Sequence, residues 1–303
     1  MFVQRFLFQQ CFAATSKLLN NFVRFSSTSS EASTKDYPVP PRLKYIDGYI
    51  RDSRNDRKLR DTFIFGTKNG ETKELRIEIA DEKDIPLVVQ SYGDLFLEEV
   101  NIYRHLNSTY DEFAQLFFNR KSGMLSKGLS YIIKDEDKVV GFSLGDIYDI
   151  SHIDDEFRKQ LYSKDAKIEF KDDYAEDIKN AEGDTEKAKK IYAFFEPAML
   201  QTIHFIPPDR KKIFLYESTG IKKDYQKSNL YLTLVDLMHK SAKEKGCDYS
   251  VSYCVAKASA RQASKFCDHL FSFPFDKFKA NGKVVFDSLH DGAKALEVYG
   301  LKL

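Results

Sequence analysis

The stretch Lys211-Lys-Ile-Phe-Leu-Tyr-Glu-Ser-Thr-Gly-Ile-Lys-Lys-Asp-Tyr-Gln-Lys-Ser-Asn-Leu230 decides the fold, and a helical pattern continues from it to Gly246. Its first half is rich in β-branched and aromatic residues, which predicts a strand. A basic turn follows, and the apolar spacing from Leu230 predicts a long amphipathic helix. A strand that leads basic residues and free N–H groups into a helix N-terminus can hold phosphate.

The composition limits the possible functions. The 303 residues are 42% hydrophobic and carry a net charge of +1, so there is enough apolar material for a core and no overall basic character for binding nucleic acid. The four cysteines form no CxxC pair, which predicts a reducing compartment without disulfides or a zinc site. The six histidines form no HxH or HxxxH pair, so we expect no metal. Walker, Rossmann and GxSxG motifs are also missing from the sequence.

The first thirty residues have the composition of a targeting segment. Residues 1–30 contain Arg5, Lys17 and Arg24, many phenylalanines, leucines and serines, and no acidic residue. This basic, amphipathic, serine-rich pattern predicts a mitochondrial transit peptide and a location in the matrix. A disordered tail and an interfacial helix are the alternatives. The apolar runs are too short to predict a membrane span.

We expect three regions in the chain. Residues 1–30 form the transit peptide, residues 31–70 a linker or arm, and residues 71–303 the folded domain. Within the linker, the bases of Arg51 to Arg60 alternate with Asp52 and Asp56, which favours a solvated arm. Within the domain, residues 151–188 are polar and are expected to be an insertion over the core.

The periodicity of apolar residues predicts the elements of the domain. We expect strands at 75–79, 129–134, 139–145, 213–219 and 249–256, helices at 81–92, 111–118, 191–205, 230–246 and 259–270, and a hairpin over 271–286 turned by Asn281-Gly282. This is an α/β (α+β) order of strand, two helices, antiparallel hairpin, insertion, strand, helix, strand, helix and hairpin.

From about Leu75 to Leu303, this order resembles the GNAT superfamily of acyl-CoA-dependent N-acyltransferases, and within it the arylalkylamine and dopamine N-acetyltransferase-like branch. The resemblance rests on Asp94-Leu-Phe-Leu-Glu-Glu-Val-Asn101, Val139-Val-Gly-Phe142, the turn 220–231, and Gly282-Lys-Val-Val-Phe286 with the tail 291–303. It implies a mixed, mostly antiparallel central sheet flanked by helices. It also implies transfer of an acetyl or other acyl group from acyl-CoA to a small amine, by a monomer or homodimer.

The resemblance also implies a coenzyme A loop. The family pattern Arg/Gln-x-x-Gly-x-Gly/Ala falls on Gln226-Lys-Ser-Asn-Leu-Tyr231, where Gln226 agrees. Asn229 and Tyr231 depart from the pattern, because small residues there let pyrophosphate approach the backbone. The implied cofactor-binding residues are Thr219, Gly220, Ile221, Gln226, Lys227, Ser228, Asn229 and Leu230.

The resemblance places the catalytic base at Glu99, next to Glu98 on a Phe-rich segment, and solvated positions on a helix face are the alternative for both acids. Glu217 on the central strand is a second candidate base. Deprotonating an amine needs such a carboxylate close by. Cys267 falls where the family often has a tyrosine that protonates the departing thiolate, and small-residue packing is its alternative role.

Two other functions fit the same residues. A glycine-type acyl-CoA N-acyltransferase would suit the mitochondrial matrix, and Arg or Lys residues in the acceptor pocket would favour it. A binding protein that keeps the fold without catalysis is the non-enzyme alternative. Its support is the set of departures at Asn229, Tyr231, Cys267 and Phe271, the last of which replaces a glycine of the family pattern.

Overall fold

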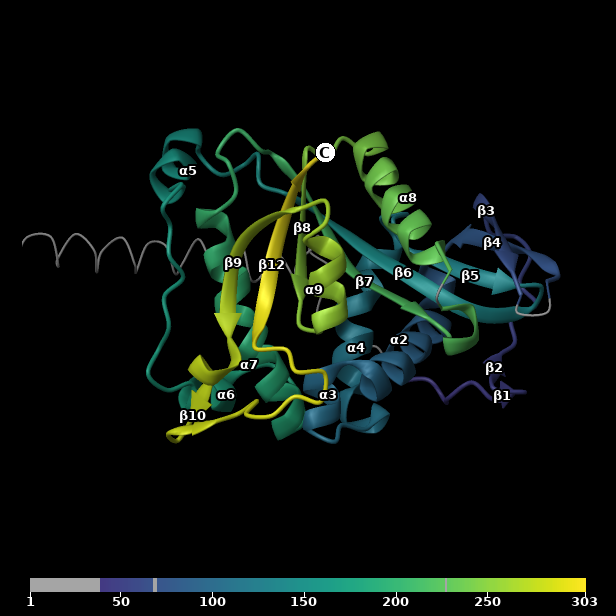
Figure 1. Ribbon diagram of the computed structural model, residues 1–303, viewed down its shortest axis with the longest axis horizontal. Helices are drawn as coiled ribbons and strands as arrows, with labels where there is room; N and C mark the ends of the chain where they lie inside the picture. The colour runs from purple at the N-terminus through teal and green to yellow at the C-terminus, as the bar shows by residue number, and fades with distance from the viewer. Residues whose placement is uncertain (1–38, 68–69, 227) are drawn as a thin grey trace, which may run out of the picture.

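The computed structural model describes residues 39–67, 70–226 and 228–303. Its centre is an eight-stranded sheet in the order β3-β4-β5-β6-β7-β8-β12-β9 (Figure 1). Only β7 and β8 are parallel, and the other neighbours are antiparallel. The strands of the sheet are β3 (Leu59–Gly66), β4 (Thr72–Ile79), β5 (Tyr131–Asp135), β6 (Lys138–Asp149), β7 (Lys212–Ile221), β8 (Tyr249–Cys254), β9 (Asp268–Pro274) and β12 (Ala295–Lys302). The predicted mixed, mostly antiparallel sheet is confirmed.

Helices cover both faces of the sheet. Figure 1 shows α8 and α9 in front of it and α2, α4 and α7 behind it. One apolar core lies under α2, α4 and α7, and a second lies under α8, where Leu234 and Met238 are fully buried. The helices are α2 (Ile85–Glu99), α3 (Asn101–His105), α4 (Tyr110–Leu125), α5 (Asp155–Leu161), α6 (Ala175–Asn180), α7 (Glu186–Gln201), α8 (Leu230–Glu244) and α9 (Lys257–Ala263).

Local chemistry explains where the main helices begin and end. Thr109 and Glu112 form a capping box at the start of α4, and Thr185 caps α7. Gly246 adopts a positive φ of 79° directly after α8, the left-handed conformation that favours glycine at a helix end. The predicted strand–turn–helix over 211–246 is therefore confirmed.

The expected solvated arm at Arg51 to Arg60 is wrong. The Arg57 side chain is 1% exposed and donates to both carboxylate oxygens of Asp84, at 2.6 and 2.9 Å. It also donates to Asp52 and to Glu78. The alternating charges of this segment thus pair with one another and with acids elsewhere in the chain. A buried charge is tolerated when it is paired in this way.

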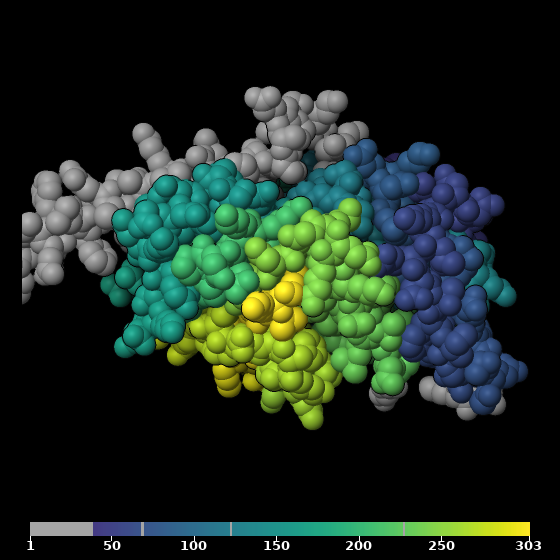
Figure 2. All heavy atoms as spheres, turned by 90° about the horizontal axis from the view of Figure 1, so that it is seen from above, coloured from purple at the N-terminus to yellow at the C-terminus, as the bar shows by residue number. Residues whose placement is uncertain are grey.

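The sheet also begins earlier than the expected domain boundary at residue 71. Strand β3 lies within the segment expected to be a linker and pairs with β4. Before it, β1 (Tyr45–Ile46) and β2 (Tyr49–Ile50) form a small hairpin. Figure 2 shows the purple N-terminal residues beside the green residues of α8, where Arg60 pairs with Glu244 at 2.8 Å.

Two further expectations change near the C-terminus. The helix expected at 259–270 ends at Ala263, and the chain has become strand β9 by Asp268. The Asn281-Gly282 turn is confirmed, but it joins only β10 (Lys279–Ala280) to β11 (Lys283–Val284). Strand β9 pairs with β12 instead, which a short-range turn signal does not reveal.

The polar segment 151–188 contains α5, α6 and the start of α7. It is anchored by Tyr174, whose fully buried ring packs against Phe278. The expected transit peptide lies outside the described residues. Among the described helices, none is long and apolar enough to cross a membrane.

Gly145 on β6 leaves room for the core under α8. A Cβ atom at this position would lie 2.4 Å from Phe214 Cε2 and 2.7 Å from Met238 Cε. We expect Gly145→Ala to lower the free energy of unfolding by about 1–3 kcal/mol, because the buried Phe214 ring must shift. Urea denaturation measures the change.

Gly66 on β3 is the matched control, because a Cβ atom there meets no atom of the described residues within 4 Å. Gly66→Ala should change the free energy of unfolding by less than about 0.5 kcal/mol. Equal effects of the two substitutions would contradict the proposed role of Gly145.

Candidate active site

The candidate site lies where β7 and β8 separate. The two strands pair only from Ile213 with Tyr249 to Tyr216 with Ser252. Among the described residues, β7 has no strand partner on that side after Tyr216, while β6 continues to pair with its other side as far as Ile221. The backbone of residues 217–221 can therefore bind an extended ligand along this edge.

Glu217 is the first residue beyond the last β7–β8 pair, and it occupies a β-bulge. Tyr216 is opposite Gly145 on β6 and Ser218 is opposite Leu144, so Glu217 is the extra residue between them. A bulge redirects a side chain and often lies next to an active site.

Glu217 lines a cavity of about 120 Å³ on the α4 side of the sheet. The wall comes from α2, α3, α4, α7 and the ends of β6, β7 and β8. Its polar and charged members are Tyr92, Tyr103, Arg120, Lys121, Tyr148, Tyr192, Tyr216, Glu217 and Tyr253. A small cavity with mostly aromatic walls and a few converging charges is the usual form of a small-molecule site.

The cavity contains a partly buried ion pair. Lys121 on α4 is 5% exposed, and its ammonium contacts the carboxylate of Glu217. The same ammonium lies over the Tyr92 ring, 4.5 Å from its centroid. The Glu217 carboxylate and the face of the Tyr92 ring thus both contact the ammonium, and this combination suits the binding of an amine.

Arg120 lies at the edge of the cavity. Its guanidinium stacks over Tyr192, 4.2 Å from the ring centroid, and is 3.6 Å from Glu182. Its Nε atom is buried without a hydrogen-bond partner in the structure. Arg120 and Lys121 give the cavity two cations against the single carboxylate of Glu217.

The tyrosines of the cavity remain protonated at neutral pH. Burial raises the pKa of Tyr216 to about 12, and it raises the pKa values of Tyr92 and Tyr148 well above their usual range. Tyr253 has a raised pKa for the same reason, and its hydroxyl lies 2.7 Å from Thr202. The wall therefore offers phenolic hydroxyl groups that can donate hydrogen bonds.

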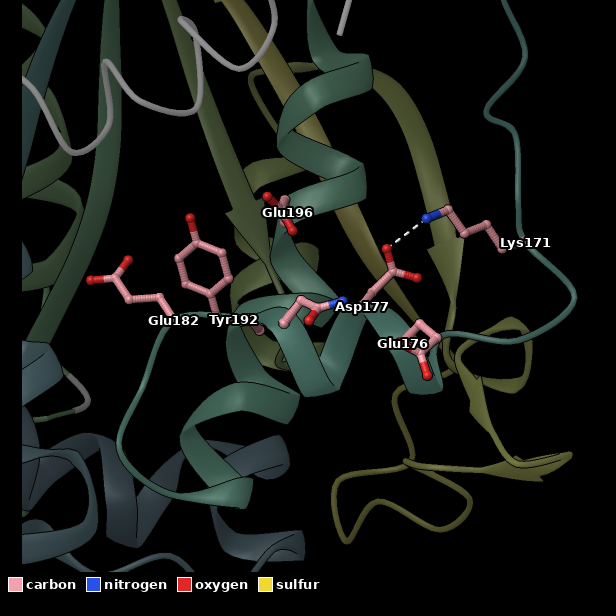
Figure 3. A pocket seen from close by; sticks show the side chains of 8 residues that line it. Lys171, Glu176, Asp177, Glu182, Tyr192 and Glu196 are labelled. Atoms are coloured by element: carbon pink, nitrogen blue, oxygen red, sulfur yellow. Dashed lines mark hydrogen bonds and ion pairs between the residues drawn. The ribbon is translucent and has the colours of Figure 1, made fainter. Parts of the chain in front are cut away.

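A second, more open hollow of about 490 Å³ shares Tyr192 with this cavity. It lies along α6 and α7, and Figure 3 shows Tyr192 and Glu196 of α7 and Glu176 and Asp177 of α6 among the side chains that line it. Asp177 pairs with Lys171 at 2.5 Å. Burial, and then the charge of Asp177, raise the pKa of Glu196. The hollow is rich in carboxylates, whereas the inner cavity is rich in cations.

Glu98 and Glu99 lie elsewhere. Both are exposed at the end of α2 and line a separate shallow hollow with Arg104. Neither is among the residues that line the tyrosine-rich cavity. The structure therefore places Glu217, the second candidate of the sequence, in the cavity, and it does not bring Glu99 there.

The predicted cofactor residues on the strand have structural roles as well. The Thr219 hydroxyl lies 2.5 Å from the Tyr216 hydroxyl and 2.7 Å from that of Ser143. A Cβ atom at Gly220 would lie 2.5 Å from Phe142, so glycine is required there by packing. The Ile221 carbonyl accepts a hydrogen bond from Gln226 Nε2 at 2.9 Å.

The turn before α8 is closed by its own hydrogen bonds. Ser228 Oγ donates to the Tyr225 carbonyl at 3.1 Å and accepts from the Leu230 N–H at 3.3 Å. Asn229 is the N-cap residue, its side chain makes no capping bond, and Leu230 is fully buried. Lys227 lies outside the described residues.

Tyr231 is the second residue of α8 and takes the position at which the family pattern has a small residue. Burial raises the pKa of its hydroxyl well above the usual range, and Tyr216 on β7 and Cys254 on β8 raise it further. Cys267, after α9, acts on the same hydroxyl and has its own pKa raised by burial to about 11. Cys267 is packed with Cys254 and Tyr299 and does not line the cavity of Glu217.

Two residues that contribute to the site, Lys121 and Asn101, were not predicted from the sequence. Lys121 gives no local signal, because its partner is 96 residues away. Asn101 is fully buried, and its Nδ2 donates to the Val255 carbonyl at 2.7 Å and to Asp291 at 3.1 Å. This bond ties α3 to the end of β8, where Val255 lines the cavity.

Comparisons with solved structures identify the fold. The chain resembles the polyamine N-acetyltransferase of Drosophila melanogaster at 11% identity, over 76% of this chain and 100% of that one, with a TM-score of 0.58. It resembles a putative arylalkylamine N-acetyltransferase of the yellow fever mosquito at 13% identity, over 83% and 98%, with a TM-score of 0.59.

A third similar structure is the C-terminal condensation domain of Ebony in complex with beta-alanyl-dopamine, at 12% identity, over 76% and 99%, with a TM-score of 0.54. No family model and no curated protein matches the sequence. The chain has the GNAT acetyltransferase fold, as the sequence resemblance predicted. Among the described residues, no group of three or more His, Cys, Asp or Glu could hold a metal ion.

Asn101 should stabilise the wall of the cavity. We expect Asn101→Ala to lower the free energy of unfolding by about 1–3 kcal/mol, because the buried Val255 carbonyl and the Asp291 carboxylate lose a donor. Urea denaturation measures this change. Asn119→Ala, an exposed change on α4, should stay within about 0.5 kcal/mol. No difference between the two variants would contradict the role given to Asn101.

Proposed function

We propose that this protein is an acyl-CoA-dependent N-acyltransferase that moves an acetyl or other acyl group to a small amine. The observation that carries the proposal is the position of Glu217. Its carboxylate lines a tyrosine-rich cavity at the point where β7 and β8 separate. The structures of N-acetyltransferases with the same fold support it, and one of these is named for polyamine acceptors.

The free edge of β7 would bind the acyl donor. Residues 217–221 present backbone N–H and C=O groups there, which suit the amide-containing pantetheine arm of coenzyme A as an added strand would. The N-terminus of α8 would bind the phosphates, helped by Lys222 and Lys223. Tyr231 stands at the start of α8 where the family pattern has a small residue, so its side chain would have to move for the phosphates of the donor to bind.

Glu217 would accept the proton of the acceptor amine, which frees the nitrogen lone pair to attack the thioester carbonyl. The departing thiolate needs a proton in turn. Burial raises the pKa of the Cys267 thiol to about 11, so this group is protonated at neutral pH and is our candidate donor. We prefer Glu217 to Glu99 and Glu98 as the base because both of those carboxylates are exposed outside the cavity.

A glycine-type N-acyltransferase is a second candidate function. Arg120 and Lys121 line the cavity, and Arg120 has a buried Nε atom without a hydrogen-bond partner in the structure. A guanidinium binds a carboxylate well, so an amino-acid acceptor fits this edge of the cavity. The mitochondrial matrix would suit such a reaction.

Calorimetric titration with acetyl-CoA and longer acyl-CoAs tests donor binding. We expect binding, and we expect Tyr231→Ala to bind more tightly by on the order of tenfold, because a large side chain is removed from the start of α8. No binding to either protein at millimolar ligand would overturn both enzyme functions. Activity assays with simple amines, polyamines and glycine then separate the two acceptor classes.

In the same assays, Glu217→Gln should lower kcat by roughly 10²–10⁴-fold, as expected for loss of a general base. Glu99→Gln is the matched comparison, since it removes an exposed carboxylate of the same size. A loss confined to Glu99→Gln would instead support the sequence-based assignment. Donor binding without turnover of any amine would favour the non-enzyme binding protein.

We also propose the mitochondrial matrix as the location, supported by the basic, acid-free composition of residues 1–30. A fluorescent reporter fused to residues 1–40 should enter mitochondria, and the fusion with Arg5, Lys17 and Arg24 changed to Glu should not. A cytosolic signal from the unchanged fusion would refute this location.

A further inference from the structure

Lys121 occupies the place that an acceptor amine would need. Its ammonium contacts the Glu217 carboxylate and lies 4.5 Å from the centroid of the Tyr92 ring. Among the described residues, it is the only lysine that lines the cavity. A primary amine is therefore already held beside the candidate base.

The position of this amine relative to the strand gap matters as much as its partners. Glu217 is the first residue beyond the last β7–β8 pair, and Tyr253 and Val255 at the end of β8 line the same cavity. The cavity therefore lies under the point where the two strands separate. A thioester bound along the free edge of β7 would therefore lie close to Glu217 and to this cavity.

We propose that Lys121 is itself an acyl acceptor, so that the protein acylates its own cavity lysine when it binds an acyl-CoA thioester. This inference rests on the proposed function, because it needs acyl-CoA to bind at the gap. It differs from that function in the acceptor, which is a side chain of this chain and not a free amine.

The reaction balances with acyl-CoA as the only co-reactant. One proton passes from the Lys121 ammonium to the Glu217 carboxylate, and the freed Nζ lone pair attacks the thioester carbonyl. The C–N bond forms and the C–S bond breaks, while a second Nζ proton goes to the departing thiolate. The products are Nε-acyl-Lys121 and coenzyme A, and Glu217 releases its proton to water.

Acylation would change the cavity. The amide of acyl-Lys121 carries no charge, so Glu217 loses its ionic partner and becomes available to a second amine. Of the two cations that line the cavity, only Arg120 would then remain charged. Acylation of Lys121 would thus prepare the base for external acceptors.

Peptide mass spectrometry after incubation of the full chain with acetyl-CoA tests the inference. Unassisted chemistry modifies lysines in the order of their exposure, which favours Lys83, whose side chain is 76% exposed, over the buried Lys121. We expect the reverse, with the initial rate at Lys121 on the order of tenfold above that at Lys83, because the held geometry replaces a bimolecular encounter. Glu217→Gln should abolish this preference.

Lys127 is the matched control lysine. It follows α4, pairs with the Asp146 carboxylate and lies 5.7 Å from the Tyr148 ring centroid, but it does not line the cavity. Lys127→Arg should leave acylation of Lys121 unchanged. Lys121→Arg, which keeps the positive charge, should remove the dominant acylated peptide, with folding checked by circular dichroism.

Calorimetry on the same samples separates the two possible failures. Acetyl-CoA that does not bind would refute the proposed function, and the inference with it. Acetyl-CoA that binds while Lys121 is acylated no faster than Lys83 or Lys127 would overturn this inference alone.

Discussion

The candidate site depends on one constraint, which is the short parallel pairing of β7 and β8. The strands share four residue pairs and then separate, while β6 remains paired with β7 as far as Ile221. A parallel pair needs a long crossover, and here α8 supplies it. The same connection thus places a helix N-terminus, a free strand edge and the bulged Glu217 next to one another. The aromatic cavity under the gap collects side chains from α2, α4 and α7 because those helices cover that face of the sheet.

The fold could be predicted from the sequence to the extent that its signals are local. The strand at 213–219 and the helix from Leu230 follow from apolar periodicity and from Gly246, and both are present. Arg57 could not be placed, because its burial depends on Asp84 and Glu78, which are more than twenty residues away. The same limit applies to the residues of the site, which could be predicted only where the signal was local. Glu99 has the expected neighbours in sequence, but α2 ends there and leaves it exposed, whereas the pairing of Glu217 with Lys121 joins two distant segments.

The fold of this chain does not by itself show where an acyl donor binds. A similarity of 11–13% identity fixes the arrangement of strands and helices, and one protein with the same arrangement is a condensation domain. Function therefore has to be argued from the site. Tyr231 is the decisive residue, because it replaces the small residue of the family pattern at the start of α8.

The distribution of charge connects the acceptor to Lys121. An amine is cationic at neutral pH, so the carboxylates of the outer hollow attract it, while Arg120 and Lys121 repel it from the inner cavity. At Glu217 it must also compete with an ammonium that is already held in place and buried. A carboxylated acceptor would instead be repelled by the carboxylates of the outer hollow and attracted by Arg120 and Lys121 in the inner cavity. Neutralising Lys121 by acylation removes the nearest repulsive charge and the competitor in one step, and a free amine would then find in Glu217 an unpaired base.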